Sequence, residues 1–152
     1  DVGGLHGVDV QASVFDTEVS ERRNLALDLV AAEAPCERHV LMQLMRRECA
    51  TLQVHQPQRF VDSLVGLCEG LERELGCLVG ANAYLTPCGA QGLAPHYDDV
   101  EVFVLHCHGA KRWRVYAPLE GHQLPRESSG DLSREALGEP LMDVVLRPGD
   151  LP

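Results

Sequence analysis

The sequence predicts a mainly β domain with helices at its N-terminal end. Two features lead to this fold class. Apolar residues recur at steps of three and four up to Leu75, and the apolar period changes to two from Cys77 onward. A chain of 152 residues is also long enough for one domain with a core of its own. Helices followed by several short strands indicate an α+β or mainly β domain, built as a sandwich or a barrel.

The first fifty residues carry the least regular pattern. Residues 19–30 mix leucine, alanine and charged residues as a helix does, and residues 36–49 repeat apolar residues at helical spacing after Pro35. We therefore expect two helices in this part. We divide the chain into an unassigned helical or irregular segment at residues 1–50 and a domain at residues 51–152.

The next helix, at residues 57–75, has clear ends. Pro57 suits the first helical position, where no N–H is needed, and Gly76 suits a left-handed stop. Between these ends, one apolar stripe contains Phe60, Leu64, Leu67, Leu71 and Leu75. We expect this stripe to pack against a sheet, because strand patterns follow at once.

Short strands follow that helix. Residues 78–86 alternate as a strand does, and residues 100–107 and 111–116 predict a hairpin that turns at Gly109. The remaining expectations are a polar loop at residues 117–140, a short helix within it at 133–137, a last strand at 141–146 and a turn at 148–150.

Charge and cysteine content narrow the function classes. Lys and Arg number 13 against 23 Asp and Glu, for a net charge of −10. A chain this acidic lacks a basic tract for phosphates, so we expect no direct nucleic-acid binding and favour a basic protein partner. No apolar run approaches the roughly 18 residues that cross a bilayer, so we expect no membrane contact. Six irregularly spaced cysteines indicate reduced, mostly buried thiols of an intracellular protein, with a disulfide scaffold as the weaker alternative.

His96 and Asp98 are the strongest candidates for chemistry. In extended backbone, side chains two residues apart point to the same side, so this imidazole and carboxylate can converge on one point. An imidazole and a carboxylate are two of the three ligands that hold Fe(II) in non-haem oxygenases. The competing interpretation is a solvated turn with two polar side chains.

Lys111 follows at the start of the next expected strand. A metal-bound 2-oxoacid with a distal carboxylate needs such a cation inside a barrel, although a solvated hairpin lysine fits the same pattern. We expect Trp113 and Phe103 to be core residues, and Arg112 and Arg114 to face outward.

The other polar residues favour ordinary structural roles. We expect Asp99 and Glu101 to face solvent, with support of the site as the second option. We expect surface or locally hydrogen-bonded positions for the remaining histidines, which are His6, His39, His55, His106, His108 and His122.

Three stretches of the chain carry a resemblance to a known family. They are residues 82–87 (NAYLTP), 91–101 (QGLAPHYDDVE) and 109–116 (GAKRWRVY), followed by 137–140 (LGEP) and 146–151 (LRPGDL). In order and spacing they resemble the JmjC-type Fe(II)/2-oxoglutarate oxygenases. Within that family the chain resembles the ribosomal oxygenase branch, nucleolar proteins described as histidyl hydroxylases of ribosomal proteins and as histone lysine demethylases. The resemblance covers about residues 51–151.

The resemblance implies a fold and a site. The fold would be a double-stranded β-helix, the cupin-like jelly roll, with residues 51–152 as its N-terminal part. His96 and Asp98 would be two iron ligands, and Lys111 would pair with the distal carboxylate of 2-oxoglutarate. Asn82 would hydrogen-bond the cosubstrate or its surroundings, and Tyr84 would line the pocket.

The same resemblance implies a third ligand, a histidine on a strand shortly after the turn at Asp150. The chain ends at Pro152, so we expect a fragment with a truncated jelly roll that is inactive alone. The implied function is an Fe(II)- and 2-oxoglutarate-dependent protein oxygenase of the nucleus and nucleolus. It would hydroxylate ribosomal protein histidine, demethylate histone lysine, or both, and its full-length form could be a homo-oligomer. The alternative is a truncated or degenerate cupin-like domain without activity that at most binds a protein.

Overall fold

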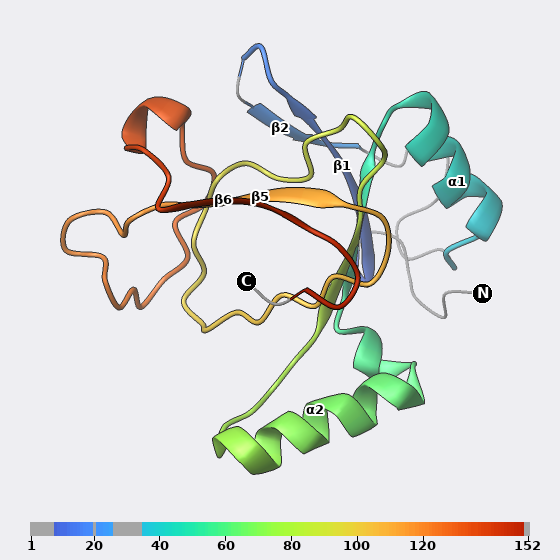
Figure 1. Cartoon of the computed structure of the whole chain (residues 1–152). Coiled ribbons are helices and arrows are strands. Elements are labelled where there is room, and N and C mark those ends of the chain that lie inside the picture. The colour runs from blue at the N-terminus through green and yellow to red at the C-terminus, as the bar shows by residue number, and fades with distance from the viewer. Residues whose placement is uncertain (1–7, 20, 26–34, 151–152) are drawn as a thin grey trace. The chain divides into compact units, whose positions relative to one another are not determined.

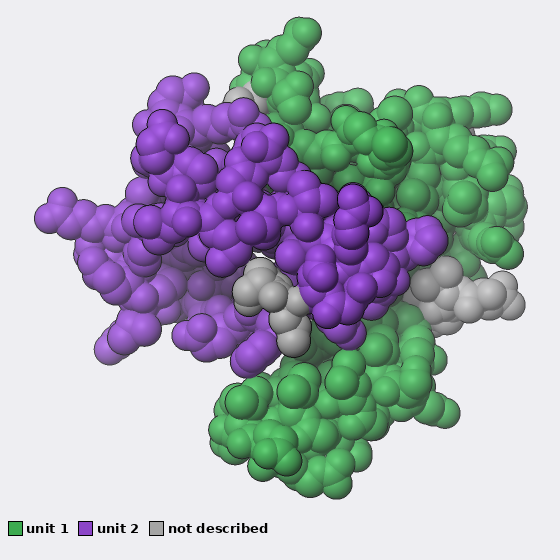
Figure 2. All heavy atoms as spheres, viewed as in Figure 1, with its two compact units in different colours: residues 1–93 green, residues 94–152 purple. Residues whose placement is uncertain are grey.

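Residues 10–85 contain a four-stranded antiparallel sheet in this computed structural model, which describes residues 8–19, 21–25 and 35–150 (Figure 1). In spatial order its strands are β2 (Glu21–Asn24), β1 (Val10–Asp16), β3 (Thr51–His55) and β4 (Asn82–Leu85). The chain divides into two compact units, residues 1–93 and 94–152, drawn in green and purple in Figure 2. The four-stranded sheet belongs to the first unit.

A small apolar core lies between this sheet and helix α1 (Arg38–Arg47). Alternate residues of β1 point into the core, as the period of a strand requires. The buried members of the cluster are Val10, Ala12, Cys36, Leu41, Ala50 and Leu52. Burial, and then the nearby Asp9 carboxylate, raise the pKa of the Cys36 thiol above its ordinary value.

The predicted helix at residues 36–49 is confirmed with shorter bounds, as α1. The helix predicted at residues 19–30 is wrong at 21–24, which form β2, and residues 26–30 lie outside the described part. The Asp16 carboxylate accepts hydrogen bonds from the N–H groups of Glu18 (2.9 Å) and Val19 (3.4 Å). This turn reverses the chain so that residues 21–24 pair with β1.

The helix predicted at residues 57–75 is present with one interruption. It begins at Pro57 as η1 (Pro57–Arg59) and continues as α2 (Asp62–Leu75). Gly76 ends it in the left-handed conformation, with φ of 69°, as expected. The stripe does not pack against a sheet as a whole: Cys68 is the buried residue of α2, and Leu67 and Leu75 are 44% and 48% exposed.

Two strands form the sheet of the second unit. These are β5 (Lys111–Val115) and β6 (Met142–Leu146), which confirm the strands predicted at residues 111–116 and 141–146. The predicted hairpin of residues 100–107 with 111–116 is wrong, because β5 pairs with β6 instead. The short helix η2 (Arg134–Ala136) and the turn at 148–150, where Asp150 N–H donates to Arg147 C=O at 3.0 Å, agree with the sequence.

The pairing of β5 with β6 has a physical reason. Asp143 lies directly opposite Arg114 and also bonds Arg112, so one carboxylate on β6 forms ion pairs with two cations of β5. Residues 100–107 contain no strand. Phe103 is 67% exposed there, so its predicted place in the core is wrong, while Trp113 is half-buried.

All six cysteines are free thiols, and most are not buried as predicted. Cys36 and Cys68 are buried, whereas the exposed thiols are Cys49, Cys77, Cys88 and Cys107. Within the described part of the chain, no helix combines the length and the apolar character needed to cross a bilayer. Two α-helices and six strands make the described chain mostly β, as the sequence predicts.

Candidate functional site

His96 lies in an irregular segment at the start of the second unit, with its side chain exposed. Its Nδ1 is 2.8 Å from the carbonyl oxygen of Ala94. A carbonyl oxygen only accepts hydrogen bonds, so Nδ1 is the donor, and the lone pair of the corresponding neutral tautomer lies on Nε2. Metal-binding histidines are commonly oriented in this way, by a second hydrogen bond from the other ring nitrogen. This arrangement leaves Nε2 as the ring nitrogen that could bind a metal ion.

Asp98 is also exposed, and its carboxylate has a hydrogen-bond partner from a distant part of the chain. Ser128 Oγ donates to Asp98 Oδ1 at 3.3 Å, and it also lies 3.4 Å from Asp99 Oδ1. Hydroxyl contacts of this kind orient a carboxylate without neutralising it. Asp99 shares that contact, so it lies beside the candidate site as well as facing solvent.

Lys111 lies on the more buried face of β5. It is half-buried opposite Leu146, which is 4% exposed. Its Nζ is 5.5 Å from the centre of the Trp113 ring, within range of a cation–π interaction. Burial lowers the pKa of Lys111 below its ordinary value. Lys111 is thus half-buried beside an aromatic ring, and its role towards a cosubstrate stays a prediction.

The other face of β5 has a different composition. Arg112 binds Asp143 with two hydrogen bonds of 2.6 Å, and Arg114 binds the same carboxylate at 3.3 Å. The Arg112 guanidinium, followed by that of Arg114, holds the pKa of the Asp143 carboxyl below its usual value. These arginines face outward as predicted, and both form ion pairs with Asp143 of the neighbouring strand.

Asn82 and Tyr84 lie on β4, the edge strand of the first unit, two residues apart and on one face. Asn82 Oδ1 accepts from the N–H of Gln56 at 3.3 Å, and Tyr84 Oη accepts from Gln53 Nε2 at 3.1 Å. Both side chains are exposed. These contacts fix the two predicted cosubstrate residues on the strand, in a unit separate from that of His96.

Among the residues described, the structure adds no third candidate metal ligand to His96 and Asp98. Across the residues described, no three His, Cys, Asp or Glu side chains come together as a metal-binding group. An imidazole with its Nε2 lone pair and an oriented carboxylate still fit Fe(II), which takes mixed nitrogen and oxygen ligands. His96 and Asp98 could thus contribute two of three protein ligands.

One partner of this segment, His122, was not predicted from the sequence. Tyr97, between the two candidate ligands, has its hydroxyl 2.8 Å from His122 Nδ1, and the two rings are 5.8 Å apart. His122 is exposed and locally hydrogen-bonded, as predicted for it. No local pattern pointed to the pair, because 25 residues separate its members.

The remaining histidines have varied surroundings. His39 forms an ion pair with Glu37, and His108 is exposed, as expected for surface histidines. His55 and His106 each have a buried Nε2 for which the described residues provide no hydrogen-bond partner, so neither matches the expectation. His6 lies outside the described residues.

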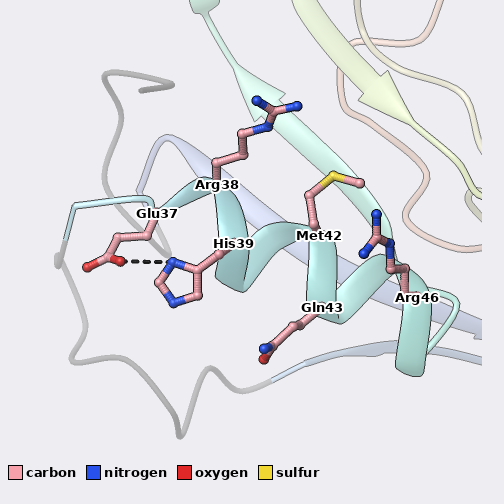
Figure 3. A pocket seen from close by; sticks show the side chains of 6 residues that line it. All are labelled: Glu37, Arg38, His39, Met42, Gln43 and Arg46. Carbon is pink, nitrogen blue, oxygen red and sulfur yellow. Dashed lines mark ion pairs between the residues drawn. The ribbon is translucent and has the colours of Figure 1, made fainter.

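A shallow hollow lies along α1 in the first unit. Its lining residues are Glu37, Arg38, His39, Met42, Gln43 and Arg46 (Figure 3). His39 Nδ1 and Glu37 Oε2 point toward one another at 3.1 Å, while the other side chains point in different directions. Both partners are more than 60% exposed, so water competes with any ligand here, and this hollow is not the candidate site.

Comparison with known proteins decides the family. Residues 53–151 match the family described as JmjC domain. The chain belongs to the JmjC domain family. Its mostly β structure with two α-helices is consistent with the JmjC fold. JmjC oxygenases generally use Fe(II) and 2-oxoglutarate.

Relatives of this JmjC chain belong to the ribosomal oxygenase branch, as the sequence resemblance indicated. The bifunctional lysine-specific demethylase and histidyl-hydroxylase NO66 of Drosophila persimilis is 54% identical over 106 residues, which cover 70% of this chain and 15% of that protein. Ribosomal oxygenase 2 of Rattus norvegicus is 54% identical over 102 residues, 67% of this chain and 21% of that protein. NO66 of Dictyostelium discoideum is 46% identical over 106 residues. The chain thus spans between 15% and 21% of the length of these relatives.

Proposed function

We propose that this chain is part of an Fe(II)- and 2-oxoglutarate-dependent protein oxygenase that hydroxylates histidine in a ribosomal protein, demethylates histone lysine, or does both. The relatives support the substrate classes, because the NO66 proteins are named for both reactions and the others for ribosomal oxygenation. One contact in the structure carries the metal proposal. The hydrogen bond of His96 Nδ1 to the Ala94 carbonyl leaves Nε2 as a ligand.

Each candidate residue has a distinct task in this proposal. His96 and Asp98 would hold Fe(II), and a further ligand of the complete protein would complete the set. Bound there, Fe(II) and 2-oxoglutarate supply the oxidising power that hydroxylates a C–H bond with O₂ while 2-oxoglutarate is converted to succinate and CO₂. Lys111 would bind the distal carboxylate of 2-oxoglutarate, and its half-buried position makes that charge-assisted contact strong.

Asn82 and Tyr84 would line the site without binding the metal ion. We propose that Asn82 hydrogen-bonds 2-oxoglutarate or its surroundings and that Tyr84 lines the substrate pocket, within a cupin-like jelly roll. Their support is the family match, which includes β4, and the hydrogen bonds that hold both side chains on one face of that strand. A hydrogen-bonded amide and phenol are preorganised for a polar ligand.

The partner and compartment follow from the same proposal. A net charge of −10 would attract a basic protein substrate, such as a ribosomal protein or a histone tail, and would repel nucleic acid. From the resemblance to the ribosomal oxygenase branch we propose a nuclear and nucleolar protein that binds neither nucleic acid nor membrane directly and whose full-length form could be a homo-oligomer.

The proposal is tested with the complete translated protein. Succinate formation from 2-oxoglutarate is measured with Fe(II) and a histidine-containing or methyl-lysine-containing basic peptide. We expect His96→Ala and Asp98→Ala each to lower turnover by more than about 100-fold, because losing a direct ligand should exceed the 10- to 100-fold cost of losing a supporting contact. His108→Ala and Glu101→Ala, both exposed, are the matched controls and should retain wild-type turnover.

Mass spectrometry of the peptides then identifies the reaction. Histidine hydroxylation adds one oxygen atom to the peptide, whereas lysine demethylation removes a methyl group and releases formaldehyde. Wild-type turnover in His96→Ala would show that the metal assignment is wrong. A complete protein that converts no 2-oxoglutarate under any of these conditions would favour the inactive, protein-binding alternative.

A further inference from the structure

One serine, distant in sequence, holds the backbone between the two candidate ligands. Ser129 N–H donates to the carbonyl of Tyr97 at 3.0 Å. Ser129 Oγ in turn accepts from the N–H of Tyr97 at 3.0 Å. Both backbone polar groups of Tyr97 are therefore bonded to the same residue, which lies 32 positions later in the chain.

The Ser129 hydroxyl is used as both acceptor and donor. It accepts from Tyr97 N–H, and its own proton has a close acceptor in the Gly130 carbonyl at 2.7 Å. A hydroxyl provides one proton and two acceptor sites, so the two bonds are compatible. The donated bond fixes the rotamer of Ser129 and keeps an acceptor site directed at Tyr97.

The same loop makes further contacts with this segment. They involve the backbone of Pro95, the side chain of Asp98 and the side chain of Tyr97, so they hold the segment before and after the Ser129 contacts. They are Leu132 N–H to the Pro95 carbonyl (2.8 Å), Ser128 Oγ to Asp98 Oδ1 (3.3 Å) and Tyr97 Oη with His122 Nδ1 (2.8 Å).

These contacts matter because Tyr97 is the single residue between His96 and Asp98. Its two backbone torsions set the directions in which the imidazole and the carboxylate leave the chain. The segment has no helix or strand around it to fix those torsions. Without the Ser129 contacts, the two ligands would have to be aligned by the metal itself, at a cost in conformational entropy.

We propose that Ser129 is a positioning residue for the metal ion held by His96 and Asp98. Its hydroxyl and its amide fix the peptide groups on both sides of Tyr97, so the two ligands are aligned before metal binds. Ser129 contacts neither the metal nor the substrate in this role. The inference rests on the proposed function, because it requires that His96 and Asp98 bind a metal.

Metal binding alone provides the test, with the complete protein and Co(II) as the probe. Co(II) takes the same nitrogen and oxygen ligands as Fe(II), is stable in air, and has visible ligand-field bands that report ligand geometry. Titrations compare wild type with Ser129→Ala, which removes the acceptor for Tyr97 N–H. Ser133→Ala is the matched control, because its hydroxyl bonds the Glu135 carboxylate in the same loop.

We expect Ser129→Ala to raise the Co(II) dissociation constant about tenfold and to alter the visible bands, as losses of supporting contacts around metal ligands do. Ser133→Ala should leave both unchanged. Ser129→Thr keeps the hydroxyl and should restore the wild-type affinity. This rescue separates a specific hydrogen bond from a general loss of folding, which thermal unfolding of each variant monitors.

The outcomes distinguish this inference from the proposed function. Wild-type protein that binds no Co(II), or His96→Ala that binds it with wild-type affinity, overturns the metal site and the role of Ser129 together. Loss of Co(II) in His96→Ala with equal affinity and spectra in Ser129→Ala and Ser133→Ala overturns the role of Ser129 alone. Weak binding that Ser129→Thr fails to restore would also overturn it.

Discussion

The two units of the chain differ in the interactions that stabilise each of them. In the first unit, strands and α1 bury a cluster of apolar side chains, including Val10 and Leu52. In the second unit, the buried apolar side chains among the described residues are Ala94 and Leu146. Its candidate ligands are held by hydrogen bonds, and its strands by the backbone ladder between β5 and β6, with the ion pairs of Asp143 on one face.

This difference has a consequence for function. Apolar burial stabilises a fold but is not directional, whereas hydrogen bonds fix the orientation of particular groups. The part of the chain with the candidate ligands relies on directional contacts, which suits a site where geometry decides the chemistry. Four of its apolar residues at 100–105 are more than 60% exposed, namely Val100, Val102, Phe103 and Leu105.

The largest change in the free energy of unfolding should come from a leucine-to-alanine substitution in the core of the first unit, compared with the same substitution in the second unit. Leu52→Ala removes a side chain that is 5% exposed, and it should lower the free energy of unfolding by about 2–5 kcal/mol. Leu105→Ala makes the same chemical change at a position that is 62% exposed, and it should cost less than about 0.5 kcal/mol. Urea denaturation of the 152-residue chain measures both. Equal costs would show that Leu105 is packed and would break the comparison.

A smaller effect, on the KM for 2-oxoglutarate, should distinguish the cations on the two faces of β5. In the complete protein, Lys111→Met should raise KM for 2-oxoglutarate about tenfold, which equals about 1.4 kcal/mol, because a charge-assisted contact is lost. Arg112→Met removes a cation from the opposite face, where it bonds Asp143, and should leave KM unchanged. Initial rates at varied 2-oxoglutarate measure both. A raised KM in Arg112→Met alone would reverse the assignment of the faces.

The smallest effect concerns the ion pairs of β5 with β6. The pKa of Asp143 is lowered in the folded chain, so the unfolded chain binds more protons as pH falls past its ordinary value of about 3.9. The stabilising contribution of this carboxylate is therefore present above that pH and is lost as pH falls through the lower folded value. Wild type should be slightly more stable than Asp143→Asn at about pH 6, and the two should converge at about pH 2. Urea denaturation at both pH values tests this; a difference that grows in acid would contradict it.

Local signals in the sequence were read correctly where one residue decides the outcome. Gly76 ends α2 in a left-handed conformation, and Pro57 begins η1. Strands β5 and β6 lie where alternation predicted them. Each of these features depends on torsions or side-chain alternation within a few residues, which the sequence displays directly.

Long-range pairing was not accessible in the same way. The β5–β6 ladder joins residues about thirty positions apart, and alternation alone favoured the nearer run at residues 100–107. Strand β2 was mistaken for a helix, because its charged residues suit either element and the turn at Asp16 decides between them. For the candidate site, the sequence indicated His96, Asp98 and Lys111 but not Ser129.

The sequence by itself determined the JmjC family, the mostly β character and the residue types of the candidate site, because these are carried by motifs of adjacent residues. Tertiary structure decided which strand pairs with β5, which face Lys111 occupies and which proton position His96 adopts. It also brought Ser129 to the Tyr97 backbone. Hydrogen bonds and strand pairs depend on distances in space, and only folding converts separations of about thirty residues into contacts of about 3 Å.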